Sequence, residues 1–258
     1  PAPRAADATA NRDAPPGQRP SLSGQEREST NGEAPRLELT GNWYMDTRVM
    51  FLMDAIPAGM GDVGEIIDTA REIRHTSELS WYRAWHATAE RVEAVADESL
   101  AGGHRVSAGH AYLRAARYHL AAEVMLHTNP EDPRILQSYR RGGELFLRGL
   151  KLLGVAVEEV QIPYASGTAS HAKLRGYFFR SREVKSPAPT LIVHQGYDAP
   201  VEATYSVARA AMERGYHVLF LEGPGQGLAI RQHGIPFRPD WEAAVSPAVD
   251  YLLQREEV

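Results

Sequence analysis

The sequence predicts an α/β protein in which a helical region precedes a partial mixed sheet with two parallel central strands. Three observations support this fold class. Between about residues 62 and 153, apolar residues recur every three or four positions, as they do on one face of a helix. After Gly154 the apolar stretches are short, and they alternate or run continuously, as in strands. Strand and helix patterns then follow each other in turn, which is typical of parallel strands joined by right-handed crossovers.

The helical region is predicted to contain four helices joined by short links, within a domain that spans residues 37–154. Asp132 and Pro133 mark a helix start, because an acidic side chain caps the first turn and proline presets the backbone at its first position. A helical bundle is the favoured arrangement. A solenoid of helical repeats is the lesser alternative, since the sequence shows no fixed period.

The sheet is predicted within residues 155–258. Strands are expected near residues 157–163 and 174–180 as an antiparallel pair, and near 190–194 and 217–221 as parallel neighbours buried on both faces. Helices are expected near residues 200–214 and 240–255. Asp240 is predicted to cap the second of these helices, and Pro247 is predicted to kink or split it. We expect an open sheet edge beside residues 217–221.

Composition limits the functions that the chain can have. Residues 1–36 hold Leu22 as their only large apolar residue, so we expect a disordered tail. The net charge of -5 argues against nucleic-acid binding. No apolar run is long enough to span a membrane, and we expect a cytoplasmic protein. The absence of cysteine excludes disulfides and thiolate metal sites. No cofactor is expected, and homo-oligomerisation is compatible with the sequence.

The first candidate site is His194-Gln195-Gly196-Tyr197-Asp198, at the carboxyl end of a predicted parallel strand. Ligands of open α/β sheets bind at these strand ends. Gly196 would let the backbone approach a substrate closely, and Asp198 is a candidate substrate-binding residue. The alternative is a plain strand-to-helix turn with Asp198 near a helix cap.

The second candidate is Glu222-Gly223-Pro224-Gly225-Gln226-Gly227, after the next predicted strand. A phosphate cradle is disfavoured, because the glycine spacing differs from Gly-x-Gly-x-x-Gly and no helix is predicted directly at the last glycine. We therefore expect a tight, exposed loop that lies beside the first motif. Gly223 and Gly225 would then border the same substrate pocket.

Two further sets of residues lie in the helical region. His119, Glu123 and His127 are spaced four apart on one helix, as metal ligands can be. No second helix offers an obvious fourth ligand, so we predict packed or solvated residues and no metal. Trp81 and Trp85 are candidates to line a substrate pocket, although aromatic residues at this spacing more often form core.

Taken together, several segments resemble α/β-hydrolases with an N-terminal helical cap. This family includes 2,6-dihydroxypseudooxynicotine hydrolase, a carbon–carbon bond hydrolase, and fungal polyketide chain-shortening hydrolases. The resemblance runs from about Asp62 to the end of the chain and corresponds only to the N-terminal portion of the family's members. It is carried by these segments: Ser80-Trp81-Tyr82-Arg83-Ala84-Trp85, Asp132-Pro133-Arg134, Gly196-Tyr197-Asp198, Glu222–Gly227 and Pro236-Phe237-Arg238-Pro239-Asp240-Trp241-Glu242.

The resemblance implies a serine nucleophile, an acid and a histidine, all beyond Val258. The nucleophile motif of this fold, Gly-x-Ser-x-Gly, occurs nowhere in the sequence. Only Gly196 and Tyr197 carry over, as the backbone positions of an oxyanion hole. Residues 194–196 depart from the Gly-Gly often found there.

The implied function is hydrolysis of a carbon–carbon (ketone) or ester bond in a small-molecule substrate, once the missing part completes the site. This chain alone is expected to be inactive. The alternative is a non-catalytic protein, either truncated or an interaction protein with a helical module. A nucleotide-binding enzyme is poorly supported by the glycine spacing.

Overall fold

The computed structural model describes residues 38–73, 77–166, 169–185, 187–196 and 198–258. The predicted tail, residues 1–36, and the predicted oxyanion residue Tyr197 lie outside this described part. Helices and sheet belong to one unit, Leu37–Val258. A division of that unit between residues 154 and 155 stays a prediction.

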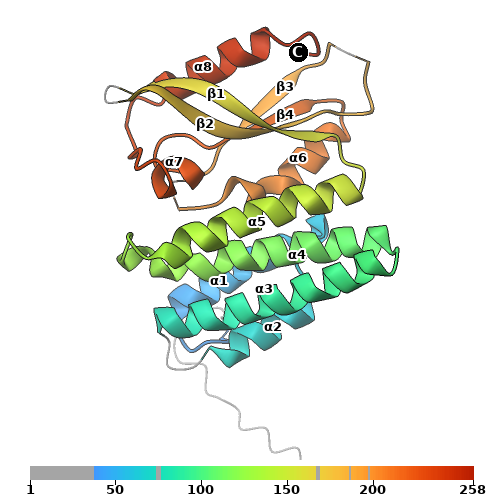
Figure 1. Cartoon of the computed structure of the whole chain (residues 1–258), viewed down its shortest axis with the longest axis vertical. Coiled ribbons are helices and arrows are strands. Elements are labelled where there is room, and N and C mark those ends of the chain that lie inside the picture. Colours follow the sequence, from blue (N-terminus) through green and yellow to red (C-terminus); the bar gives the residue numbers. More distant parts are fainter. Residues whose placement is uncertain (1–37, 74–76, 167–168, 186, 197) are drawn as a thin grey trace, which may run out of the picture. The chain divides into compact units, whose positions relative to one another are not determined.

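The N-terminal half is helical, as the periodicity predicted, and α3, α4 and α5 lie side by side (Figure 1). Asp132 caps α5 by accepting a hydrogen bond from the Arg134 backbone at 3.0 Å. Trp81, Trp85, Tyr112 and Tyr118 are among the largest fully buried side chains. The elements are α1 (Trp43–Met53), η1 (Ile56–Ala58), α2 (Val63–Glu72), α3 (Glu78–Ala101), α4 (Arg105–Glu123), η2 (Val124–Thr128) and α5 (Pro133–Leu152).

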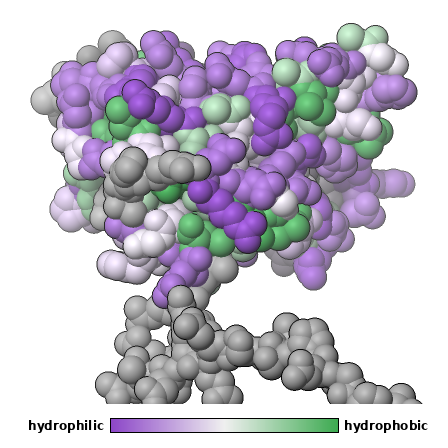
Figure 2. Space-filling view, turned by 90° about the horizontal axis from the view of Figure 1, so that it is seen from below, coloured by the Kyte–Doolittle hydropathy of each residue, from purple (hydrophilic) through white to green (hydrophobic). Residues whose placement is uncertain are grey.

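The sequence interpretation did not anticipate helix α1. Asn42 caps it, because its side chain accepts hydrogen bonds from the backbone of the first turn. Met45, Val49 and Leu52 are buried at helical spacing and fix its inner face. The face seen from below in Figure 2 is mostly hydrophilic, with smaller hydrophobic areas between the charged side chains. None of the described helices combines the length and hydrophobicity needed to cross a bilayer.

The sheet has the order β1-β2-β4-β3. The antiparallel pairing of β1 with β2 and the parallel pairing of β3 with β4 confirm the prediction. β1 and β2 extend further toward each other than expected, so positions 166 and 170 belong to strands rather than to a connection. The strands are β1 (Val157–Ser166), β2 (Ala169–Phe179), β3 (Thr190–Val193) and β4 (His217–Leu221).

The sheet order corrects two expectations about burial. β4 lies between β2 and β3, and all of its residues are buried. β3 is therefore one of the two edge strands of the described sheet, with β1 at the other edge, and its Leu191 is 39% exposed. The expected burial of residues 190–194 on both faces was wrong, as was the open edge beside 217–221. The order along the chain is not the order in the sheet, because the crossover carries β4 back to pair with β2.

The two faces of the sheet pack against different helices. Val218 and Phe220 of β4 join the core of the helical region, whereas Leu219 and Leu221 pack with α8 residues such as Ala248. This alternation follows from the two-residue period of a strand. Thus the helical region covers one face, and α8 covers the other (Figure 1). The helices of this half are η3 (Val201–Thr204), α6 (Tyr205–Met212), α7 (Gly227–Arg231) and α8 (Glu242–Leu253).

Three details of these helices differ from expectation. A short helix, α7, does begin at Gly227. Asp240 does not cap α8, because its carboxylate is engaged by Arg238 instead. α8 runs on through Pro247, so the predicted split was wrong, while the predicted kink stays a prediction. Proline removes one backbone hydrogen bond, and the remaining bonds of the helix and its packing on the sheet maintain it.

Candidate functional site

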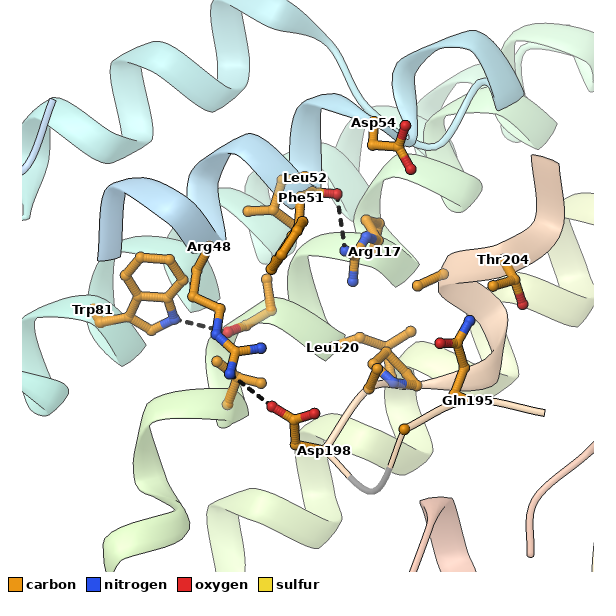
Figure 3. Close-up of a pocket in the computed structure, with 16 residues that line it drawn as sticks. Arg48, Phe51, Leu52, Asp54, Trp81, Arg117, Leu120, Gln195, Asp198 and Thr204 are labelled. Carbon is orange, nitrogen blue, oxygen red and sulfur yellow. Dashed lines mark hydrogen bonds and ion pairs between the residues drawn. The ribbon is translucent and has the colours of Figure 1, made fainter. Parts of the chain in front are cut away.

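A cavity of about 460 Å³ lies between the helical region and the loop that follows β3 (Figure 3). This is within the size range of small-molecule sites. Helices α1 and α4 form one side, and the loop and η3 form the other. It is lined by Arg48, Phe51, Leu52, Asp54, Trp81, Arg117, Leu120, Ala121, Val124, Gln195, Gly196, Asp198, Ala199, Pro200, Ala203 and Thr204.

The loop after β3 presents Gly196 to open space. A Cβ atom on this glycine would meet only the Asp198 Oδ1 atom, at 3.9 Å. The backbone at Gly196 is therefore accessible to a molecule in the cavity, as the sequence predicted for a substrate-binding turn. Tyr197, the predicted oxyanion donor, lies outside the described residues, so its role stays a prediction.

Asp198 connects this loop to the first helix. Its Oδ2 atom accepts a hydrogen bond from the Arg48 Nη2 atom at 2.6 Å, in a pair whose side chains are 20% (Arg48) and 33% (Asp198) exposed. Arg48 also donates to the Tyr44 hydroxyl at 2.7 Å. Asp198 thus lines the cavity, and its charge is balanced by Arg48, which belongs to a helix that sequence reasoning missed. A substrate-binding role for Asp198 stays a prediction.

Arg117 of α4 is the second cation of the cavity and is only 7% exposed. Its Nη2 atom donates to the Phe51 carbonyl at 3.3 Å, and its Nε atom has no partner within the described residues. Burial lowers the pKa of Arg117 to about 10, with Glu202 and Asp54 opposing this shift. Arg117 therefore stays charged at neutral pH, yet it forms no ion pair with the described part of the chain.

The two predicted pocket tryptophans have different places. Trp81 lines the cavity and donates from Nε1 to the Ala121 carbonyl at 2.8 Å. Trp85 is fully buried between Trp81 and Tyr118 and does not line the cavity. Trp85 is therefore a core residue, which the sequence analysis gave as the commoner role for aromatic residues at this spacing.

The loop Glu222–Gly227 is buried, so the expectation of an exposed rim was wrong. Gly223 packs against the Trp241 ring, and Gly225 has φ of 79° and packs against Phe237. Neither glycine lines the cavity. The segment between α7 and α8 folds over the loop, and no pattern local to the glycines could indicate this contact.

The predicted proximity of the two loops is confirmed through Gln226. Its Nε2 atom donates to the Gln195 carbonyl and, at 3.4 Å, to the Gly196 carbonyl. Its Oε1 atom accepts from the Gly223 backbone at 2.9 Å. A buried amide with several partners has a fixed orientation, so Gln226 ties the cavity loop to the second loop.

A buried ionic cluster lies between the second loop and the helices. Arg175 donates to Glu222 from Nε at 3.0 Å and to Glu202 from Nη2 at 3.0 Å. The hydroxyls of Tyr177 and Tyr139 donate to Glu202 and Glu222 at 2.8 and 2.7 Å. Burial raises the pKa of Glu202 although Arg175 opposes the shift, and the carboxylates raise the pKa of Arg175 against the effect of burial. This cluster joins β2, η3 and the end of β4.

The Glu222 carboxylate also starts α7. Its Oε2 atom accepts a hydrogen bond from the Leu228 backbone at 3.0 Å. Gly227 has φ of 45°, and a Cβ atom there would overlap the Glu222 side chain. Glycine is thus required at this position both for its backbone conformation and for space.

His119 has a different partner from Glu123 and His127, which bond to each other. His119 contacts Glu93 at 3.2 Å, and burial lowers the pKa of this histidine. Glu123 is fully buried and is bonded by His127 and, at 2.7 Å, by Arg231 of α7. The predicted interpretation as packed residues is the one that these contacts support.

Sequence reasoning missed half of the cavity wall. Arg48, Phe51 and Asp54 come from α1 and its end, and Arg117 comes from the inner face of α4. The cap at Asn42 and the apolar spacing behind it could have identified α1. No sequence signal distinguishes Arg117 from the many arginines that face solvent.

No family model matches the sequence. The chain is 36% identical over 212 residues to Hydrolase acrC of Aspergillus aculeatus, covering 78% of this chain and 49% of that protein. It is 37% identical over 213 residues to 20-hydroxy-prefusarin hydrolase FUS2 of Gibberella moniliformis, covering 81% of this chain and 50% of that protein. It is 33% identical over 215 residues to Alpha/beta hydrolase xenA of Xenoacremonium sinensis, covering 82% of this chain and 49% of that protein. The chain thus spans about half the length of these relatives.

Among solved structures, 2,6-dihydroxy-pseudo-oxynicotine hydrolase is similar with a TM-score of 0.63 and 21% identity, covering 84% of this chain and 55% of that one. At this identity the likeness establishes the fold alone. The mixed sheet, the helical region before it and the fungal hydrolase relatives agree with one another. The chain therefore has a partial α/β-hydrolase fold and resembles the N-terminal portion of fungal hydrolases of that type.

Proposed function

We propose that this chain supplies the substrate cavity and the oxyanion loop of a hydrolase that cleaves a carbon–carbon bond beside a ketone, or an ester bond. The helical region acts as the cap over that cavity. The observation that carries the proposal is the cavity itself, enclosed between α1, α4 and the loop at the carboxyl end of β3. That strand end is where ligands of open α/β sheets bind.

The proposed chemistry assigns the backbone at Gly196 and Tyr197 to the developing oxyanion. One such donor contributes roughly 3 kcal/mol to lowering the barrier when it is aimed at the developing charge. A serine nucleophile would form an acyl-enzyme intermediate. Because the sequence has no Gly-x-Ser-x-Gly, we assign that serine, with its acid and histidine, to a segment outside this chain.

The relatives support the reaction class. Their names describe hydrolases, and FUS2 is named for a 20-hydroxy-prefusarin substrate, which is a small molecule. The cavity has walls of mixed character that suit such a ligand: Leu120, Val124 and Trp81 are apolar, and Gln195 and Thr204 are polar. A small-molecule substrate with a carbonyl group is therefore the proposed ligand.

The proposal predicts binding without turnover by this chain. Methyl 3-phenylpropanoate and 4-phenyl-2-butanone, an ester and a ketone of similar shape, should bind in ligand-observed NMR. Ala203→Phe, which fills the cavity, should abolish binding, whereas Ala87→Phe on the exposed face of α3 should not. An activated ester should show no saturable hydrolysis, and a serine-reactive phosphonate should label no residue stoichiometrically. Equal binding to both variants would contradict the cavity assignment, and stoichiometric labelling would show a nucleophile within the chain.

A further inference from the structure

The cavity contains a buried cation, Arg117, that forms no ion pair with any residue that the structure describes. Two other arginines have buried side chains: those of Arg175 and Arg231 are 6% and 5% exposed. Arg175 is paired with Glu202 and Glu222, and Arg231 is paired with Glu123 at 2.7 Å. Arg117, at 7% exposure, has no carboxylate partner among the described residues. A buried charge is costly unless it is paired, so Arg117 is the exception that needs a reason.

The guanidinium of Arg117 is directed into the cavity (Figure 3). Its hydrogen bond to the Phe51 carbonyl is long, at 3.3 Å, and its Nε atom is buried without a partner in the described part of the chain. A guanidinium carries five N–H donors in a planar fork that matches a carboxylate. Of the two terminal nitrogens, only Nη2 has a hydrogen-bond partner within the described residues, so this end of the guanidinium can bind a ligand.

The other charges of the cavity leave Arg117 available. Arg48 is engaged by Asp198 at 2.6 Å, so these two charges balance each other. Glu202, which favours the charged form of Arg117 from a distance, is committed to Arg175. Asp54 lines the cavity but is exposed to solvent and lies beyond ion-pair distance of Arg117. An anion that enters the cavity would thus meet one buried cation that has no ion-pair partner among the described residues.

We propose that Arg117 binds the carboxylate of an acidic small molecule, whose apolar body packs against Trp81, Leu120 and Val124. This inference rests on the proposed function and deepens it, because it makes the substrates of this cavity acidic. The apolar wall supplies burial for the body of the ligand. The guanidinium fork supplies orientation, since two parallel hydrogen bonds fix a carboxylate in one plane.

The test compares matched ligands on matched variants of the full chain. Isothermal titration would measure 3-phenylpropanoate, which carries the charge, against 3-phenylpropanamide and 4-phenyl-2-butanone, which do not. Arg117→Met removes the charge with little change of volume, and Arg117→Lys keeps the charge without the fork. The control is Arg114→Met, on the same helix, because Arg114 is paired with Glu65 at 3.0 Å and does not line the cavity.

Wild-type protein should prefer the acid over the amide, and Arg117→Met should weaken acid binding at least about tenfold while leaving amide binding unchanged. The affinity of Arg117→Lys for the acid should fall between those of wild type and Arg117→Met. Arg114→Met should bind as wild type. Arg117→Met should also melt no lower than wild type, because it removes an unpaired buried charge.

Each contrary outcome has a separate meaning. If wild type binds the ketone and the amide but shows no preference for the acid, the inference fails and the proposed function stands. If none of the compounds binds, both fail. If Arg117→Met unfolds or loses stability while Arg114→Met does not, the guanidinium is structural, and the inference is overturned.

Discussion

Replacing Arg175 with methionine should strongly destabilise the protein, because this side chain balances two buried carboxylates. Glu202 and Glu222 are 0% and 1% exposed, and Arg175 is the cation that both contact. Removing one partner of a buried ion pair costs about 3–5 kcal/mol. The tyrosine hydroxyls at 2.8 and 2.7 Å still satisfy part of each carboxylate, so we expect a loss of about 4 kcal/mol. For a protein of this size that corresponds to a melting temperature lower by about 8–16 °C.

The loss of stability in Arg175→Met should depend on pH, because the surroundings of Glu202 change the pKa of its carboxyl group. Burial already raises the pKa of Glu202, and removing Arg175 removes the charge that opposes this shift. The folded variant would hold a proton that the unfolded chain has released, so its stability should fall as pH rises through the raised pKa. The destabilisation should therefore be larger at pH 8 than at pH 5.

Urea denaturation at both pH values would measure the effect. Arg180→Met is the matched control, because its side chain is 49% exposed and its surface ion pairs contribute less than about 1 kcal/mol. Changing Glu202 and Glu222 to glutamine in the Arg175→Met background should recover much of the loss, since these three positions then carry no charge. A loss below about 1 kcal/mol at pH 8, or one that is the same at both pH values, would refute the electrostatic argument.

Two smaller changes test how the loops are built. Gly227→Ala should lower the free energy of unfolding by about 2–4 kcal/mol, because its Cβ atom overlaps Glu222 and its φ is positive. Gly103→Ala, also at positive φ but in open space, should cost only about 1 kcal/mol in the same denaturation assay, and equal losses would show that crowding is unimportant. Asp198→Asn should change stability by less than about 1 kcal/mol, since its pair with Arg48 is partly exposed. It should nevertheless accelerate amide hydrogen exchange in residues 195–199, and unchanged exchange there would contradict a positioning role for this ion pair.

The sequence determined most of the helices and all four strands. Helical periodicity located the run from α2 to α5, and Asp132 with Pro133 identified where α5 begins. Short apolar runs located the strands, and their alternation with helices predicted the parallel pair. Because carboxyl ends of adjacent parallel strands meet at one edge, the proximity of the two glycine-containing loops followed as well. These are local patterns, and a local pattern is sufficient to specify a helix, a strand or a turn.

Only the tertiary structure decided which elements pair and which charges are balanced. The sheet order placed β3, rather than β4, at the edge. Packing of Trp241 and Phe237 buried the second loop, and α1 completed the cavity from a distant part of the chain. Nothing in the sequence distinguishes Arg117 from Arg175. In the structure Arg175 contacts two carboxylates, whereas Arg117 contacts none among the described residues. The physical reason is that a charge is paired by residues far along the chain, and only folding brings them within hydrogen-bond distance.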